Sequence, residues 1–418
     1  MMLRRGILTA LAATTAIALS SCTTQTAGST PPIPEDSQPT GDGHGAITGA
    51  EEVAEPPLHL VSIDAAGAVG MLDLLDDTTT ELGTISAPSA VATDGRYLFS
   101  TTPQGVDIVD SGVWTWDHVD HFHYYRADPK LLGKVTGEGA ATVSTSNTST
   151  IGGTGLFFPL TGEAVLLDNE ALSQGEIREL FRIETGQHSG LAVPLGGGAL
   201  VTHAGDRGQA TEVRFHRADG TPVDGSSVEC PDAQGTITTR VGVVIGCATG
   251  ALLATAGDGE VTFEHLPYPE GTHTQPAVEF DNRKGRPSVA ARAGDDGIWL
   301  LDTRARTWQL IPTTEPLLRV SAADDAGEHI VALDRSGRVR VYDGSSGDEV
   351  AATEPLLARS LADPALLDSI ELTVDRQRAY LNAPAEGVVY EIAYADNARL
   401  ARMLETPTTP TFFAETGR

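Results

Sequence analysis

The chain has 418 residues, with 28 Lys and Arg against 57 Asp and Glu, so its formal net charge is −29 at pH 7. A chain this acidic repels the phosphate backbone, so we expect no nucleic-acid partner. Hydrophobic residues make up 40% of the sequence, which at this length is enough for a large buried core.

Residues 1–21 have the features of a lipoprotein signal peptide. Two arginines precede an apolar run that is shorter than the roughly 20 residues needed to span a bilayer. The run ends in Leu-Ser-Ser-Cys22, which matches the bacterial lipobox; a plain signal peptide with an incidental cysteine is the alternative. We therefore expect acyl chains on Cys22 and an extracytoplasmic protein held at the outer face of the cytoplasmic membrane.

Residues 22–56 carry the acylated cysteine and then many Thr, Ser, Pro, Gly and acidic residues, with few large apolar side chains. Such a segment cannot bury enough surface to offset its ordering entropy, so the sequence predicts a flexible tether. Residues 57–418 remain for one folded domain, which we expect to be a monomer.

From Leu58 onward, short apolar strands alternate with turns that contain Asp-Gly, Ser-Gly or Gly-Asp. The clearest unit, 318–352, has four strands of period two. Similar units of about 45 residues occur near 88–134, 140–183, 187–226, 231–267, 275–313 and 365–405. Helical periodicity is plausible only in 170–181. Four-stranded repeats of this length are typical of an all-β fold, a β-propeller.

The ends of the repeat region predict a closed ring. Residues 58–85 hold only about three strands, whereas 410–418 resemble 88–96, the first strand of another unit. The C-terminal strand would then complete the first blade and leave no exposed sheet edge. The count is eight blades, with seven possible, and a pair of β-sandwiches is the alternative fold.

Residues 114–125 contain three of the 11 histidines. His121 and His123 have the same parity and would share one face of a strand, where two imidazoles can chelate a zinc ion. His118 has the opposite parity and joins them only across a bulge or turn. Asp117 and Asp120 could be ligands or could orient an imidazole. The alternative is a set of surface or stacking histidines.

Three further residues outside this cluster are candidates. His188 opens a repeat, where residues lie near the centre of a propeller, so it could complete the site; a turn or core histidine is the alternative. Cys230 and Cys247 are the only other cysteines, and two cysteines in an oxidising compartment usually pair. We expect a structural disulfide. A catalytic or metal-binding pair is the alternative, but the two cysteines are far apart in sequence and lack a Cys-x-x-Cys spacing.

The segment Trp-Asp-His-Val-Asp-His-Phe-His-Tyr-Tyr-Arg at 116–126 resembles the signature of the AztD family of extracytoplasmic zinc metallochaperones. The stretch at 188–195 and the cysteine pair agree with this resemblance. It implies a β-propeller that passes zinc to the solute-binding protein of a zinc ABC transporter. By the same resemblance, His121 and His123 are the strongest ligands, with His118 and His188 behind them.

The sequence departs from the family pattern at two places. The family tends to have a His-rich N-terminal segment, whereas this tether has only His44. Family members tend to have a histidine after the first cysteine, where Gln234 stands here. These differences put zinc capture by the tether and any secondary site in doubt.

Three functions therefore compete. The leading hypothesis is a zinc-binding transfer protein that is not an enzyme. The second is a lipid-anchored scaffold that binds protein or glycan without metal, and the third is a hydrolase or lyase that uses a metal-bound water at the same histidines. Stoichiometric zinc binding without turnover would favour the transfer protein, and the absence of metal would favour the scaffold. Zinc beside a general base and an open substrate cleft would favour the hydrolase or lyase.

Overall fold

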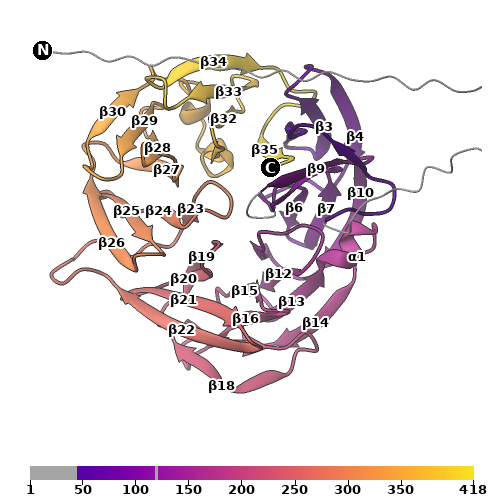
Figure 1. The fold of residues 1–418 in the computed structure, drawn as a ribbon, viewed down its shortest axis with the longest axis vertical. Helices are drawn as coiled ribbons and strands as arrows, with labels where there is room; N and C mark the ends of the chain where they lie inside the picture. The colour runs from indigo at the N-terminus through magenta and orange to yellow at the C-terminus, as the bar shows by residue number, and fades with distance from the viewer. Residues whose placement is uncertain (1–44, 118–120) are drawn as a thin grey trace, which may run out of the picture. The chain divides into compact units, whose positions relative to one another are not determined.

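The computed structural model describes residues 45–117 and 121–418. Within these residues there are eight four-stranded antiparallel sheets and one three-stranded sheet. The four-stranded sheets form a ring like the blades of a propeller (Figure 1). The predicted all-β propeller is confirmed.

The first four blades run as follows, each from its inner strand outward. They comprise β35 (Phe412–Thr416), β2 (His59–Ile63), β3 (Ala68–Asp73) and β4 (Thr79–Thr84); β5 (Ala90–Thr93), β6 (Tyr97–Thr102), β7 (Gly105–Asp110) and β10 (Lys130–Thr136); β11 (Thr142–Thr145), β12 (Gly153–Phe158), β13 (Glu163–Asp168) and β14 (Glu179–Glu184); and β15 (Ala192–Leu195), β16 (Gly198–Ala204), β17 (Ala210–His216) and β18 (Pro222–Glu229).

The remaining four blades follow the same order. They comprise β19 (Gln234–Thr238), β20 (Val243–Cys247), β21 (Gly250–Gly257) and β22 (Glu260–Pro267); β23 (Phe280–Asp281), β24 (Ser288–Arg292), β25 (Gly297–Asp302) and β26 (Thr307–Pro312); β27 (Leu317–Ala322), β28 (His329–Asp334), β29 (Val339–Asp343) and β30 (Glu349–Ala352); and β31 (Leu372–Val374), β32 (Ala379–Ala383), β33 (Val388–Ala393) and β34 (Arg399–Leu404).

The C-terminal strand closes the ring. Strand β35 pairs antiparallel with β2, from Phe412 opposite Ile63 to Thr416 opposite His59. It also contacts β5 of the second blade and β32 of the eighth. The expected completion of the first blade by the C-terminus is therefore confirmed, and it hides a sheet edge that would otherwise be open to aggregation.

The core lies between blades. Leu333 and Val341 of the seventh blade share one cluster with Leu381 and Ile392 of the eighth, all at 0% exposure. The second and third strands of a blade are covered by neighbouring blades, so β6 and β7 are buried along their whole length, whereas an innermost strand such as β5 is only partly buried. Outer strands such as β22 alternate between exposed and half-buried positions. The fold is thus stabilised by many inter-blade contacts.

The predicted disulfide is present and joins Cys230 to Cys247. Cys230 precedes β19, and Cys247 ends β20. Both are buried in a cluster that contains Leu200 of the fourth blade and Ile245 of the fifth. The bond therefore links the segment that enters the fifth blade to that blade's second strand.

Helices are short in this structure. Helix α1 (Asn169–Ser173) is capped by the Asp168 carboxylate, and the 3-10 helices are η1 (Ser360–Ala362) and η2 (Pro364–Ser369). The helical pattern expected over 170–181 ends early, because Gly175 has a φ of 82° and the chain enters β14 at Glu179. No helix in the described ranges is long and apolar enough to cross a membrane.

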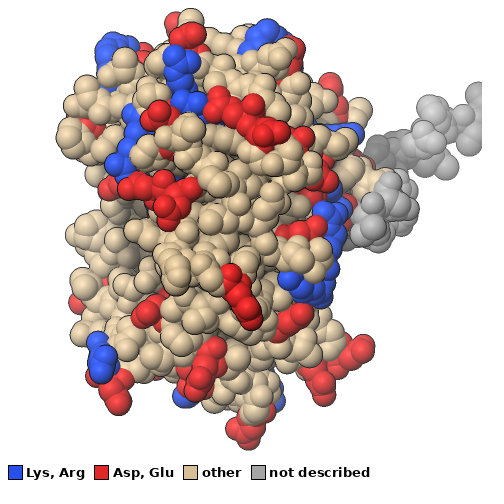
Figure 2. Space-filling model, turned by 90° about the vertical axis from the view of Figure 1, so that its left-hand side faces the viewer, with Lys and Arg blue, Asp and Glu red and all other residues tan. Residues whose placement is uncertain are grey.

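Acidic and basic side chains are interspersed over the face seen in Figure 2. Several buried carboxylates of the blades are paired with arginines; Arg340 Nε, for example, lies 2.6 Å from Asp334 Oδ2, whose side chain is 0% exposed. Paired charges of this kind offset the cost of burying a carboxylate inside a blade.

Candidate metal centre

The histidine-rich segment belongs to a hairpin inserted into the second blade. Strands β8 (Val113–Asp117) and β9 (Phe122–Arg126) lie between β7 and β10 in sequence, but they pair with β1 (Glu51–Val53) in a separate three-stranded sheet. Gly112 enters the hairpin with a φ of 74°, and a Cβ there would lie 2.3 Å from the Ala127 carbonyl oxygen. The chain therefore leaves the blade at a position that favours glycine.

The base of the hairpin is held by Trp114, whose side chain is 1% exposed. Its Nε1–H donates to the Gly45 carbonyl oxygen at 3.0 Å, and its ring stacks on Tyr125 with centroids 5.2 Å apart. The Arg96 guanidinium lies 4.0 Å from the Trp114 ring centroid and donates twice to Asp110, at 2.9 and 2.8 Å. These contacts fix the hairpin to the second blade.

Strand β1 lies in the range expected for the tether. Residues Glu51 to Val53 pair antiparallel with residues Arg126 to Tyr124, so this part of the chain forms backbone hydrogen bonds with the free edge of β9. Because sides alternate along a strand, Glu52 lies on the same face as Tyr125 and His123, whereas Glu51 lies on the other. The segment that leads to the N-terminus thus contributes a carboxylate to the histidine face.

His121 and His123 are brought together as expected. Their Nε2 atoms are 3.0 Å apart, and their ring centroids are 4.8 Å apart. The centroid distance is shorter than a head-on arrangement of the rings would give, so the rings are tilted away from the line that joins the two Nε2 atoms. Two zinc–nitrogen bonds that meet at a tetrahedral angle would place the nitrogens about 3.3 Å apart. The pair therefore fits one edge of a zinc tetrahedron.

Glu52 orients one of these rings. Its Oε1 lies 2.7 Å from His123 Nδ1, so the carboxylate accepts the Nδ1–H and leaves Nε2 as the ligating atom. Carboxylate–histidine pairs of this kind fix the tautomer of metal-binding imidazoles. Sequence reasoning did not identify Glu52, because no local spacing connects it to a histidine 71 residues away.

The other residues of the predicted cluster are placed differently. Asp117 forms an ion pair with Arg240 of the turn between β19 and β20. His118 and Asp120 lie outside the described residues, as does Cys22. Within residues 45–117 and 121–418, no group of three or more His, Cys, Asp or Glu side chains converges as a metal site.

His188 lies between the third and fourth blades. Its Nδ1 is 2.7 Å from the Gly186 carbonyl oxygen, its Nε2 is 2.9 Å from Thr202 Oγ1, and its ring meets Phe157 edge-on at 4.6 Å. Burial lowers the pKa of this imidazole, and the Gly186 carbonyl opposes the shift in part. Both ring nitrogens of His188 are thus engaged in hydrogen bonds within these two blades.

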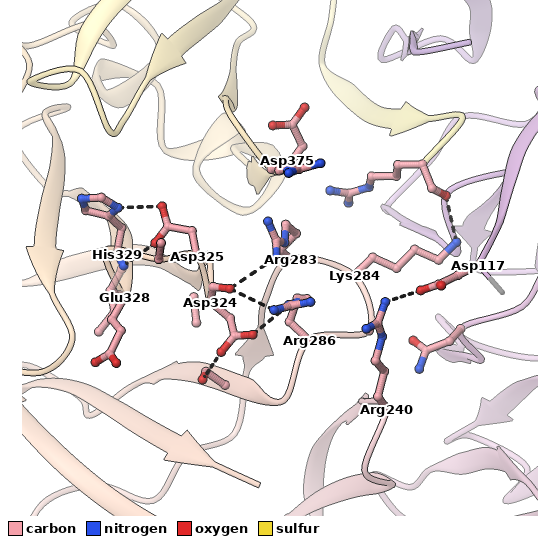
Figure 3. A pocket seen from close by; sticks show the side chains of 18 of the residues that line it. Asp117, Arg240, Arg283, Lys284, Arg286, Asp324, Asp325, Glu328, His329 and Asp375 are labelled. Atoms are coloured by element: carbon pink, nitrogen blue, oxygen red, sulfur yellow. Dashed lines mark hydrogen bonds and ion pairs between the residues drawn. The ribbon is translucent and has the colours of Figure 1, made fainter. Parts of the chain in front are cut away.

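A cavity of about 1510 Å³ opens beside the hairpin, which contributes Trp116, Asp117 and Phe122 to its wall. Figure 3 shows Arg240 reaching Asp117 across this space, with Arg286 on Asp324. Arg304, which also lines the cavity, pairs with Asp302 and Asp324, so three arginines of the wall are bound to carboxylates that line it too. The hairpin therefore lies beside a wide cavity to which several other blades contribute charged side chains.

Lys284 reaches toward the chain's last residue in this cavity. Its Nζ donates to the Arg418 backbone oxygen at 3.1 Å. Burial lowers the pKa of Lys284 to about 8, and the charge of Asp94 opposes this shift. The cavity wall therefore holds an ammonium whose charge is lost near neutral to mildly alkaline pH.

No protein-family model matches the sequence. Two structures of AztD from Citrobacter koseri, one of them the apo form, each align with a TM-score of 0.72 at 20% identity, covering 86% of this chain and 97% of theirs. The dihydro-heme d1 dehydrogenase NirN in complex with DHE aligns with a TM-score of 0.54 at 14% identity, covering 87% of this chain and 76% of that one. The chain therefore has the fold of the AztD structures.

Proposed function

We propose that this protein is an extracytoplasmic zinc metallochaperone that binds Zn²⁺ through His121 and His123. The observation that carries the proposal is the distance of 3.0 Å between the Nε2 atoms of His121 and His123, together with the contact by which Glu52 orients the His123 ring. The AztD-like fold supports the same function. The recipient in this proposal is the solute-binding protein of a zinc ABC transporter, and acyl chains on Cys22 keep the donor at the membrane.

Two imidazoles occupy only half of a tetrahedral zinc shell. The remaining positions are left for water, for His118 or Asp120, or for ligands of the recipient. His121 is exposed and Phe122 is 47% exposed, so a recipient can approach this part of the hairpin. Transfer then proceeds by stepwise ligand exchange, which needs no redox chemistry because zinc is d¹⁰.

A competitive zinc titration tests the binding step. Purified residues 23–418 should bind zinc stoichiometrically, and His121→Ala or His123→Ala should each weaken binding more than about tenfold. His265→Ala is the matched control, since this exposed histidine lies on β22, outside the hairpin, and its Nε2 is 3.2 Å from Thr249 Oγ1. Circular dichroism checks the fold of each variant. Wild-type binding no tighter than micromolar would favour the metal-free scaffold instead.

A transfer experiment tests the delivery step. Zinc-loaded protein is mixed with the apo solute-binding protein in the presence of excess chelator. Direct transfer should place zinc on the recipient faster than zinc is lost to chelator in the recipient's absence. If the recipient acquires zinc only at the rate of release to chelator, the two proteins do not exchange the ion directly.

A further inference from the structure

The cavity beside the hairpin is rich in basic side chains, although the protein as a whole is acidic. The chain has 28 Lys and Arg against 57 Asp and Glu, whereas the described residues that line this cavity include seven Lys and Arg against six Asp and Glu. Its volume of about 1510 Å³ has room for an organic molecule. Positive charge gathered in a hollow of the surface attracts anions. We propose that this cavity binds a small organic anion that carries two or more carboxylates.

The carboxylates of the cavity wall are committed to other groups. Three of the six pair with the arginines described above. Asp325 Oδ2 lies 2.7 Å from His329 Nδ1, and Asp375 Oδ1 accepts two backbone N–H groups of its own turn, both at 2.6 Å. The sixth, Glu328, is exposed, and its carboxylate points away from Arg283 in Figure 3. The acids of the wall therefore do not neutralise all of its basic side chains.

Three basic side chains of the wall form no ion pair with a side-chain carboxylate within residues 45–117 and 121–418. Arg283 Nη2 donates to the Asp324 backbone oxygen at 3.3 Å, and Lys284 Nζ donates to the Arg418 backbone oxygen at 3.1 Å. The third is Arg376, an exposed residue in the turn between β31 and β32. A guanidinium has five N–H donors, so the one bond of Arg283 leaves most of them for an anion.

Burial makes the charges of Arg283 and Lys284 costly. Burial and the nearby Arg286 lower the pKa of Arg283, and burial lowers the pKa of Lys284 to about 8. A bound carboxylate would stabilise both cations, and the planar fork of a guanidinium matches the two oxygens of a carboxylate. Because Arg376 comes from a different blade, one carboxylate cannot serve every cation of the wall, and this favours an anion with several.

The loop that carries Arg283 and Lys284 is held in place by backbone contacts. It connects β23 to β24 at the inner edge of the sixth blade (Figure 1). The Arg283 backbone N–H donates to the Ala322 oxygen of β27 at 2.8 Å, and the Gly285 oxygen accepts the Arg240 backbone N–H at 3.0 Å. Gly285 has a φ of 70°, which favours glycine at this turn. A loop fixed in this way loses little freedom when an anion binds.

Calorimetric titration of the metal-free protein with citrate tests the proposal, beside sodium sulfate at equal ionic strength. Citrate should bind at one site and raise the melting temperature by linkage. Arg283→Met and Arg376→Met each remove a charge but keep an unbranched side chain, so each should weaken citrate binding at least about tenfold. Arg399→Met is the matched control, since this exposed arginine on β34 lies outside the cavity and pairs with Asp396. Circular dichroism checks every fold, and the exposure of Arg376 keeps the test valid if Arg283→Met does not fold.

This inference does not rest on the proposed function, because His121→Ala/His123→Ala should bind citrate as the wild type does. Loss of citrate binding in that variant would place the anion at the hairpin instead. A wild-type protein that binds no citrate would overturn the inference. So would an equal loss in Arg399→Met and the two cavity variants, which would show a general charge effect. Sulfate binding as tight as citrate binding would exclude recognition of an organic polycarboxylate.

Discussion

Replacing Glu52 by Gln should weaken zinc binding at the hairpin without removing a ligand. The substitution keeps the size of the side chain but takes away the negative charge that faces His123 Nδ1 at 2.7 Å. Loss of such an orienting partner typically costs 10–100-fold in metal affinity. The Glu52 side chain is 54% exposed, so solvent screens the carboxylate and we expect the lower end, about tenfold or roughly 1.4 kcal/mol.

The measurement is a competitive zinc titration of Glu52→Gln beside Glu51→Gln. Glu51 is the matched control because it is the neighbouring residue of β1 and lies on the opposite face. It should bind zinc as the wild type does. Equal affinity of Glu52→Gln and wild type would refute the orienting role, and an equal loss in both variants would show a general charge effect instead.

Three other predictions concern the anchor, the disulfide and a buried acid. Cys22→Ser should release the protein from the membrane; fractionation that finds it as membrane-bound as wild type would contradict the lipid anchor. Reduction of Cys230–Cys247, with a sequence separation of 17, should lower the free energy of unfolding by about 3 kcal/mol and leave zinc affinity intact. Thermal melts with and without reductant check this, and zinc loss on reduction would mean that the sulfurs serve the metal site. Burial raises the pKa of Glu415 to about 8, although the charge of Arg418 opposes the shift. The stability that protonated Glu415 contributes is therefore fully present below pH 4.5, the ordinary pKa of a glutamate, and is lost as the pH rises through about 8. Melts of Glu415→Gln from about pH 5 to about pH 9 should show a smaller alkaline loss than wild type; an unchanged pH profile would rule out this account.

The propeller architecture could be predicted because it depends on patterns that are local in the sequence. Period-two strands and glycine turns recur along the chain, and the similarity between 410–418 and 88–96 anticipated the pairing of β35 with β2. The inserted hairpin could not be predicted in the same way. Strands β8 and β9 alternate like blade strands, and nothing in their own residues indicates which sheet they join.

At the site, too, local features could be predicted from the sequence, whereas contacts between distant residues could not. The close spacing of His121 and His123 predicted their approach, whereas the contact of Glu52 with His123 joins distant parts of the chain. The expectation for His188 rested on its position at the start of a blade, but the fold places its ring against Phe157 and Thr202.

The central claim is that one zinc ion binds between His121 and His123, and an anomalous-scattering crystal structure of the zinc-loaded protein tests it most directly. Data collected on either side of the zinc edge locate the ion without assuming its ligands. The account predicts a peak about 2.0–2.1 Å from both Nε2 atoms, with the Glu52 carboxylate still on His123 Nδ1. A fully loaded crystal with no zinc between His121 and His123 would contradict it.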